Sequence, residues 1–180
     1  MVDSLTSDGA LAPLVIIGSP RSGTTFLSHM VNRFFDMRLS RDNGTVLRFH
    51  RLLKHYEPLS DAANLRRLIK HLYADRYFQD RLIARGLSLS EAQLFERVHP
   101  RTYAALVAAV FGATAETYQR GSWGYKRASM ARSTTGNVNA VFPSARIVPN
   151  LISVSIDEQS IRVLAHFASA QKLRDGMRSV

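Results

Sequence analysis

Cysteine is absent from the 180-residue chain, tryptophan occurs once, and no apolar run is long enough to cross a membrane. Without cysteine, the chain has no disulfide framework, no thiolate metal site and no cysteine nucleophile. A membrane span needs about 20 consecutive apolar residues, whereas the run Leu14–Ile17 fits a short buried strand. Residues 1–13 contain two aspartates and no basic side chain, unlike the start of a signal peptide. We therefore expect a cytoplasmic protein.

Acidic side chains are few compared with basic ones, 14 against 24, which gives a formal charge of +10. A field of this sign attracts polyanions and phosphorylated small molecules without selecting among them. The six histidines include no His-x3-His pair, so we expect no metal site. Hydrophobic residues make up 46% of the chain, enough to bury a core in one domain spanning residues 1–180.

What is present is a strand, a glycine-rich turn and a helix in succession. The strand Leu14–Ile17 leads into the turn, whose sequence is Gly18-Ser-Pro-Arg-Ser-Gly-Thr-Thr25. This order opens an α/β phosphate-binding fold, because backbone N–H groups of the turn and the positive end of the helix attract an anion. The spacing that follows the turn predicts one apolar helix face, made of Phe26, Leu27, Met30, Val31, Phe34 and Phe35.

The turn differs from an ATP-binding loop at one position that matters for chemistry. It keeps the Gly-x4-Gly spacing, but Thr24 stands where nucleotide triphosphatases carry lysine, and the basic group lies inside the loop at Arg21. A phosphosulfate group carries less charge than a triphosphate, so we expect Arg21 and backbone amides to be able to hold it without Mg²⁺.

Three segments resemble elements of the sulfotransferases that use 3′-phosphoadenosine-5′-phosphosulfate (PAPS) as the donor. Residues 20–27 are similar to the 5′-phosphosulfate loop, residues 123–126 to a Gly-x-Lys element, and residues 142–148 to the segment before the 3′-phosphate strand. The resemblance covers residues 14–148. It implies a three-layer P-loop fold with a central parallel sheet, incomplete at the C-terminus, and sulfuryl transfer from PAPS to a hydroxyl or amine acceptor. It also implies the donor-binding residues, which are Ser19, Arg21, Ser22, Gly23, Thr24 and Thr25.

The same resemblance indicates catalytic residues. Arg21 and Lys126 are expected to stabilise negative charge on the leaving phosphate oxygen. An acceptor hydroxyl also needs a base. Asp42 lies 21 positions after Arg21, where the family usually has a glutamate, and His50 is the alternative.

The resemblance ends after Val148, where the family continues with Arg-Asp and this chain has Pro149 and Asn150. Proline lacks the N–H that an interior parallel strand uses, so we expect the strand to stop at Val148. Residues 151–180 then form a divergent tail, in which Arg162 is a candidate for holding the 3′-phosphate. Either the chain is a divergent short member, or it is truncated or altered after residue 148 and is inactive.

Two other functions fit part of the sequence. A P-loop kinase or nucleotide hydrolase would share the loop, but Thr24 replaces its lysine. A basic polyanion-binding module would explain the charge of +10, yet the chain lacks zinc spacing and interleaved aromatic and basic residues. We therefore expect no nucleic-acid partner; the partners are a nucleotide sulfate donor and an acceptor of unidentified chemistry.

The remaining pattern predicts helices and one further strand. We predict a helix that starts at Ser60-Asp61 and has an inward apolar face, and a second helix over residues 90–98. A third helix is predicted to follow with Pro100 in its first turn. Residues 36–58 are predicted to be irregular. Residues 123–126 are predicted to form an edge strand that runs into a loop.

Overall fold

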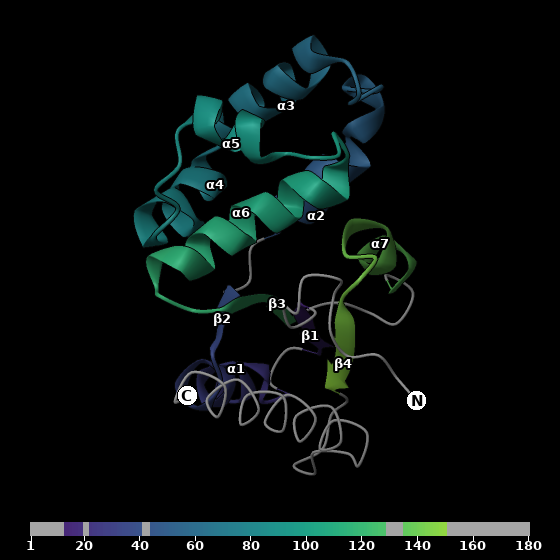
Figure 1. Cartoon of the computed structure of the whole chain (residues 1–180). Helices are drawn as coiled ribbons and strands as arrows, with labels where there is room; N and C mark the ends of the chain where they lie inside the picture. The colour runs from purple at the N-terminus through teal and green to yellow at the C-terminus, as the bar shows by residue number, and fades with distance from the viewer. Residues whose placement is uncertain (1–12, 20–21, 41–43, 129–134, 151–180) are drawn as a thin grey trace. The chain divides into compact units, whose positions relative to one another are not determined.

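The computed structural model describes residues 13–19, 22–40, 44–128 and 135–150. The chain divides into two compact units (Figure 1). Unit 1 comprises Met1–Asp42, Arg120–Ser133 and Ser144–Val180, and unit 2 comprises Asn43–Gln119 and Thr134–Pro143. The single domain expected over residues 1–180 stays a prediction. None of the described helices has the length and apolar character that a membrane crossing requires.

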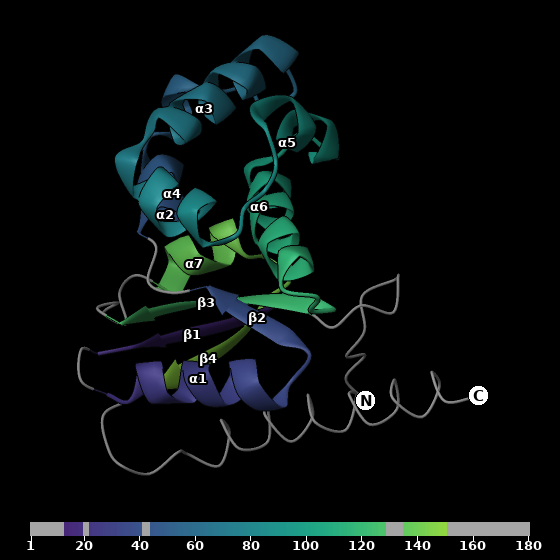
Figure 2. The ribbon, with the colours of Figure 1, turned by 90° about the vertical axis from the view of Figure 1, so that its left-hand side faces the viewer.

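Unit 1 is built on a parallel sheet with the strand order β2-β3-β1-β4. Its strands are β1 (Leu14–Gly18), β2 (Met37–Ser40), β3 (Ser122–Ala128) and β4 (Arg146–Asn150). Helix α1 (Thr24–Phe34) lies along one face of this sheet (Figure 2). The expected α/β fold with a parallel sheet is confirmed.

An apolar core lies between α1 and the sheet. Because successive side chains of a strand point to opposite faces, every second strand residue faces the helix. Burying each aliphatic side chain of this kind stabilises the fold by about 1.5–3 kcal/mol. The core therefore fixes α1 against the strand ends from which the loop emerges. Its members are Leu14, Ile16, Leu27, Val31, Met37, Leu39 and Val148.

The apolar residues of α1 divide between two faces, so the prediction of a single apolar face was wrong. Phe26, Met30 and Phe34 are 66%, 38% and 61% exposed, and their spacing of four places them in one stripe. The stripe toward the sheet contains small polar side chains as well as apolar ones. Its members are Thr24, Leu27, Ser28 and Val31.

Strand β3 lies inside the sheet, between β2 and β1, and continues to Ala128. The prediction of an edge strand ending near Lys126 was therefore wrong. A Cβ atom at position 124 would lie 2.4 Å from Leu39 Cδ2 and 2.5 Å from the Leu14 carbonyl oxygen. Only glycine lets both neighbouring strands come this close, and the sequence pattern does not reveal how closely they approach.

Strand β4 runs through Pro149 to Asn150, so the prediction that proline stops it at Val148 was also wrong. The Arg146 N–H donates to the Pro13 carbonyl oxygen at 2.8 Å. Donors alternate along a parallel ladder, so residues 146, 148 and 150 direct their N–H groups to β1. The nitrogen of Pro149 lies on the side away from β1. Since β4 is the outermost of the described strands on this side, the missing donor costs no bond within the described sheet.

Unit 2 is helical where it is described. Its α-helices are α2 (Thr45–Arg51), α3 (Ala62–Ala74), α4 (Arg76–Arg81), α5 (Glu91–Arg97), α6 (Tyr103–Thr117) and α7 (Thr135–Val141). Short 3-10 helices span Leu53–His55 and Ile83–Arg85.

Side-chain caps explain why three of these helices were predictable. Asp61 accepts the Ala63 N–H at the start of α3, and Ser90 forms a capping box with Gln93 at the start of α5. Thr102 caps α6, so Pro100 precedes that helix rather than opening it. The prediction of an irregular segment over residues 36–58 was wrong, because it contains β2 and α2. β2 has only four residues, and α2 starts without a side-chain cap.

Candidate functional site

The loop after β1 makes a tight turn into α1. Ser22 donates to the Ser19 carbonyl oxygen through its N–H at 3.2 Å and through Oγ at 2.7 Å. Gly23 follows with φ of 77°, a left-handed conformation that costs a residue with a side chain about 1–2 kcal/mol. A Cβ atom at Gly23 would meet no heavy atom within 4 Å. The described part of the turn therefore leaves open space beside Gly23.

Helix α1 offers its positive end to this loop. It begins at Thr24 without a side-chain cap and without an acidic residue in its first turn. The first N–H groups of a helix have no partner within the helix and carry the positive end of its dipole. The Leu27 N–H donates to the Gly23 carbonyl oxygen at 3.0 Å, so the helix is regular from its first turn. An anion at this end would find amide donors already in place.

The Lys126 ammonium lies beside the same helix end. Its Nζ donates to Thr25 Oγ1 at 3.2 Å, and the residue is only 6% exposed. The register pairs Lys126 with Ile16, which places both side chains on the face covered by α1. In the described ranges the Thr25 hydroxyl is the hydrogen-bond partner of Lys126, and no carboxylate pairs with it. Because burying an unpaired charge is costly, the position suits an incoming anion.

The structure brings most of the expected donor-binding residues into one turn. Thr25 and Lys126 are in contact, and the remaining described members of the loop are Ser19, Ser22, Gly23 and Thr24. Arg21 and Asp42 lie outside the described residues. His50 belongs to α2 in unit 2, where its ring centroid is 5.5 Å from that of Tyr103. The catalytic roles of these residues stay predictions.

Ser28 is a supporting residue that the sequence analysis missed. It is 2% exposed, and its Oγ donates to the Thr25 carbonyl oxygen at 2.8 Å. This bond holds the first turn of α1 on which the Thr25 hydroxyl is presented to Lys126. The sequence feature that could have revealed Ser28 is its spacing, four residues after Thr24 and three before Val31, which places it in the buried stripe of α1.

Acidic and histidine side chains do not gather into a metal site in the part of the chain that the structure describes: no group of three or more is close enough. Two sources of positive potential are seen at the loop, the N-terminal end of α1 and the Lys126 ammonium. Both sources are fixed by the backbone of unit 1.

A model of the sulfotransferase family matches residues 13–149. The match covers more than half of the chain and takes in β1, the loop, α1 and Lys126. It ends one residue before β4 does. No curated protein and no solved structure matches the chain.

Proposed function

Since this chain belongs to the sulfotransferase family, we propose that it transfers a sulfuryl group from PAPS to a hydroxyl or amine acceptor. The observation that carries this proposal is the buried Lys126 ammonium at the N-terminal end of α1, 3.2 Å from Thr25 Oγ1. Two sources of positive potential meet there, one from the helix end and one from the ammonium. A terminal sulfate joined to a phosphate is an anion that this combination attracts.

The loop and α1 are proposed to hold the 5′ end of the donor. The backbone amides of Gly23, Thr24 and Thr25 would donate to phosphate and sulfate oxygens, and Ser19 and Ser22, which are joined by their own hydrogen bonds, would line the turn. Gly23 fits this role because no described atom occupies the space beside it. Arg21, inside the loop, would add a charged donor whose planar guanidinium can donate two hydrogen bonds to oxygens of a phosphate or sulfate group.

The reaction proposed for this site is an in-line transfer. A lone pair of the acceptor oxygen forms the new S–O bond while the S–O bond to the 5′-phosphate breaks, and the bridging oxygen leaves with the electron pair. Lys126 and Arg21 would stabilise the charge that grows on this oxygen. The acceptor proton passes to a base, for which we propose Asp42, with His50 as the alternative.

The other end of the donor carries a 3′-phosphate with a charge of about −2 near neutral pH, and it needs its own donors. Arg162 is the candidate from the sequence, but it lies outside the described residues. Whether this chain binds the 3′-phosphate weakly and turns over slowly stays a prediction. A cytoplasmic site of action is part of the proposal, because a chain without cysteine suits a reducing compartment.

Ligand-dependent melting distinguishes this function from that of a nucleotide kinase. We expect adenosine 3′,5′-bisphosphate to raise the melting temperature of the protein, and ATP with Mg²⁺ to leave it unchanged, because a ligand stabilises the folded state that binds it. Transfer from PAPS is expected to be unaffected by a chelator. Stabilisation by ATP with Mg²⁺ alone, or transfer that the chelator abolishes, would contradict the proposal.

Replacing Arg21 by alanine is expected to weaken binding of adenosine 5′-phosphosulfate by about 10- to 100-fold, because a charge-assisted hydrogen bond to the anion is lost. Calorimetry measures the affinity, and circular dichroism checks that the fold is kept. Arg81→Ala serves as the matched control, since Arg81 ends α4 in unit 2. If the folded Arg21→Ala variant and the wild type bound adenosine 5′-phosphosulfate with equal affinity, Arg21 would not be a ligand-binding residue.

A further inference from the structure

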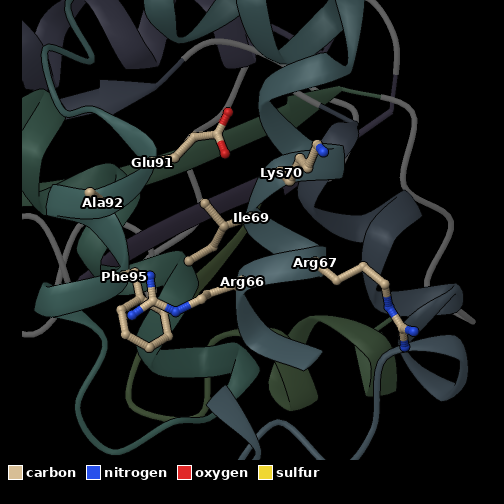
Figure 3. Close-up of a pocket in the computed structure, with 7 residues that line it drawn as sticks. All are labelled: Arg66, Arg67, Ile69, Lys70, Glu91, Ala92 and Phe95. Atoms are coloured by element: carbon tan, nitrogen blue, oxygen red, sulfur yellow. The ribbon is translucent and has the colours of Figure 1, made fainter. Parts of the chain in front are cut away.

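A hollow of about 390 Å³ lies between α3 and α5 in unit 2 (Figure 3). Its walls are held together by Tyr73 of α3, whose hydroxyl donates to the Leu89 carbonyl oxygen at 2.5 Å, just before α5 begins. Burial and, to a lesser extent, the nearby Glu91 carboxylate raise the pKa of Tyr73 to about 12, so the hydroxyl keeps its proton. We call this hollow the α3–α5 groove. Its lining residues are Arg66, Arg67, Ile69, Lys70, Glu91, Ala92 and Phe95.

The floor of the α3–α5 groove is apolar and supports guanidinium groups. Ile69 and Phe95 are 1% and 6% exposed. The Arg66 guanidinium carbon lies 3.8 Å from the centroid of the Phe95 ring, and that of Arg101 lies 5.2 Å from the same centroid. A guanidinium stacked on an aromatic face is held in place while its N–H edge stays available. The Phe95 ring therefore holds the Arg66 guanidinium in the lining of the groove.

The groove lining carries more positive than negative charge, because Arg66, Arg67 and Lys70 line it beside a single carboxylate, that of Glu91. Arg66 and Lys70 are one turn apart on α3, where like charges destabilise a helix by about 0.2–0.5 kcal/mol. Neither forms an ion pair with the residues that the structure describes. Arg67 points away from α5 and donates to the His55 carbonyl oxygen at 2.8 Å (Figure 3). An anion bound between Arg66 and Lys70 would offset their repulsion.

We propose that the α3–α5 groove binds a hydroxylated small molecule that carries a sulfate or phosphate ester. The ester oxygens accept from Arg66 and Lys70, the Glu91 carboxylate accepts from hydroxyl groups, and Ile69 and Ala92 contact the carbon skeleton. Glu91 disfavours a nucleic-acid strand, because it would face a run of phosphates. The volume of about 390 Å³ suits a ligand of monosaccharide size. This site lies in unit 2 and does not depend on the function proposed for the loop.

Calorimetry with the full chain tests the proposal, using glucose 6-sulfate and glucose 6-phosphate as probes and glucose and inorganic sulfate as reference ligands. We expect at least one ester to bind more tightly than either reference, and the tighter ester identifies the ester group. Arg66→Gln and Lys70→Gln are each expected to weaken that binding by about tenfold or more. Arg81→Gln, which removes the same charge from α4, should have no effect.

The Glu91→Gln variant tests recognition of the ligand's hydroxyl groups separately from attraction of its sulfate or phosphate group. It is expected to weaken binding of the ester but not of inorganic sulfate, because only the ester has hydroxyl groups for the carboxylate. The proposal is overturned if Arg66→Gln binds the esters as the wild type does, or if inorganic sulfate binds as tightly as the esters. It is also overturned if an oligonucleotide or an acidic peptide binds through Arg66 while neither ester binds.

Discussion

Replacing Lys126 by methionine is expected to lower the rate of sulfuryl transfer by about 10²–10³-fold, the usual loss when one donor to a developing negative charge is removed. Lys126 is buried beside Thr25 at the end of α1, so no other described side chain offers an ammonium at this position. Methionine has a similar length and no charge, and it keeps the packing of β3 against α1. The rate with PAPS at saturating acceptor measures the effect.

The Lys126→Met substitution is not expected to lower the stability of the folded state. A buried ammonium without a carboxylate partner is costly, so methionine is expected to leave the melting temperature unchanged or raise it. Lys54→Met is the matched control, because Lys54 is exposed on a 3-10 helix of unit 2 and should keep full activity. A Lys126→Met variant that is less stable but fully active would assign Lys126 a structural role only.

Replacing Gly124 by alanine is expected to destabilise the protein by about 3 kcal/mol or more, because overpacking of a core forces shifts of the backbone. The added Cβ would lie 2.5 Å from the Leu14 carbonyl oxygen, which is backbone, and 2.4 Å from Leu39 Cδ2. Leu39 belongs to the buried core of unit 1, so it can make way for the added Cβ atom only by shifting within that core. Chemical denaturation, followed by circular dichroism, measures the free energy of unfolding.

Gly23→Ala is the matched control for this prediction. The same methyl group is added, but Gly23 has open space and a φ of 77°, so only the conformational cost of about 1–2 kcal/mol applies. The free energy of unfolding should therefore fall less for Gly23→Ala than for Gly124→Ala. The reverse order would show that β3 does not need the close approach described for Gly124.

Local signals in the sequence predicted the elements that carry them. The apolar run Leu14–Ile17 and the turn after it predicted β1 and the start of α1, and the capping residues Asp61 and Ser90 marked two helices of unit 2. These features depend on neighbouring residues only. These elements could therefore be predicted without knowing which elements pack together.

Features that depend on distant neighbours could not be predicted in this way. The contact between Lys126 and Thr25 joins residues 101 positions apart, and only a resemblance to a family brought them into one site. The exposed side of α1 was misassigned because Phe26, Met30 and Phe34 are as apolar as the residues that face the sheet. The position of β3 depended on Gly124, whose neighbours belong to two other strands.

The proline in β4 also affects how readily this strand pairs with a strand of another protein molecule. The outer side of a terminal strand is a template on which strands of other chains add and aggregate. Among the strands that the structure describes, β4 is the terminal one on its side of the sheet. Its outward-facing nitrogens belong to Ile147 and Pro149, and the second has no hydrogen to donate. A foreign strand pairing there would lack one of the two amide donors that β4 would otherwise offer. Exchanging Pro149 for a residue with an N–H would restore that donor and make this edge a better template for self-association.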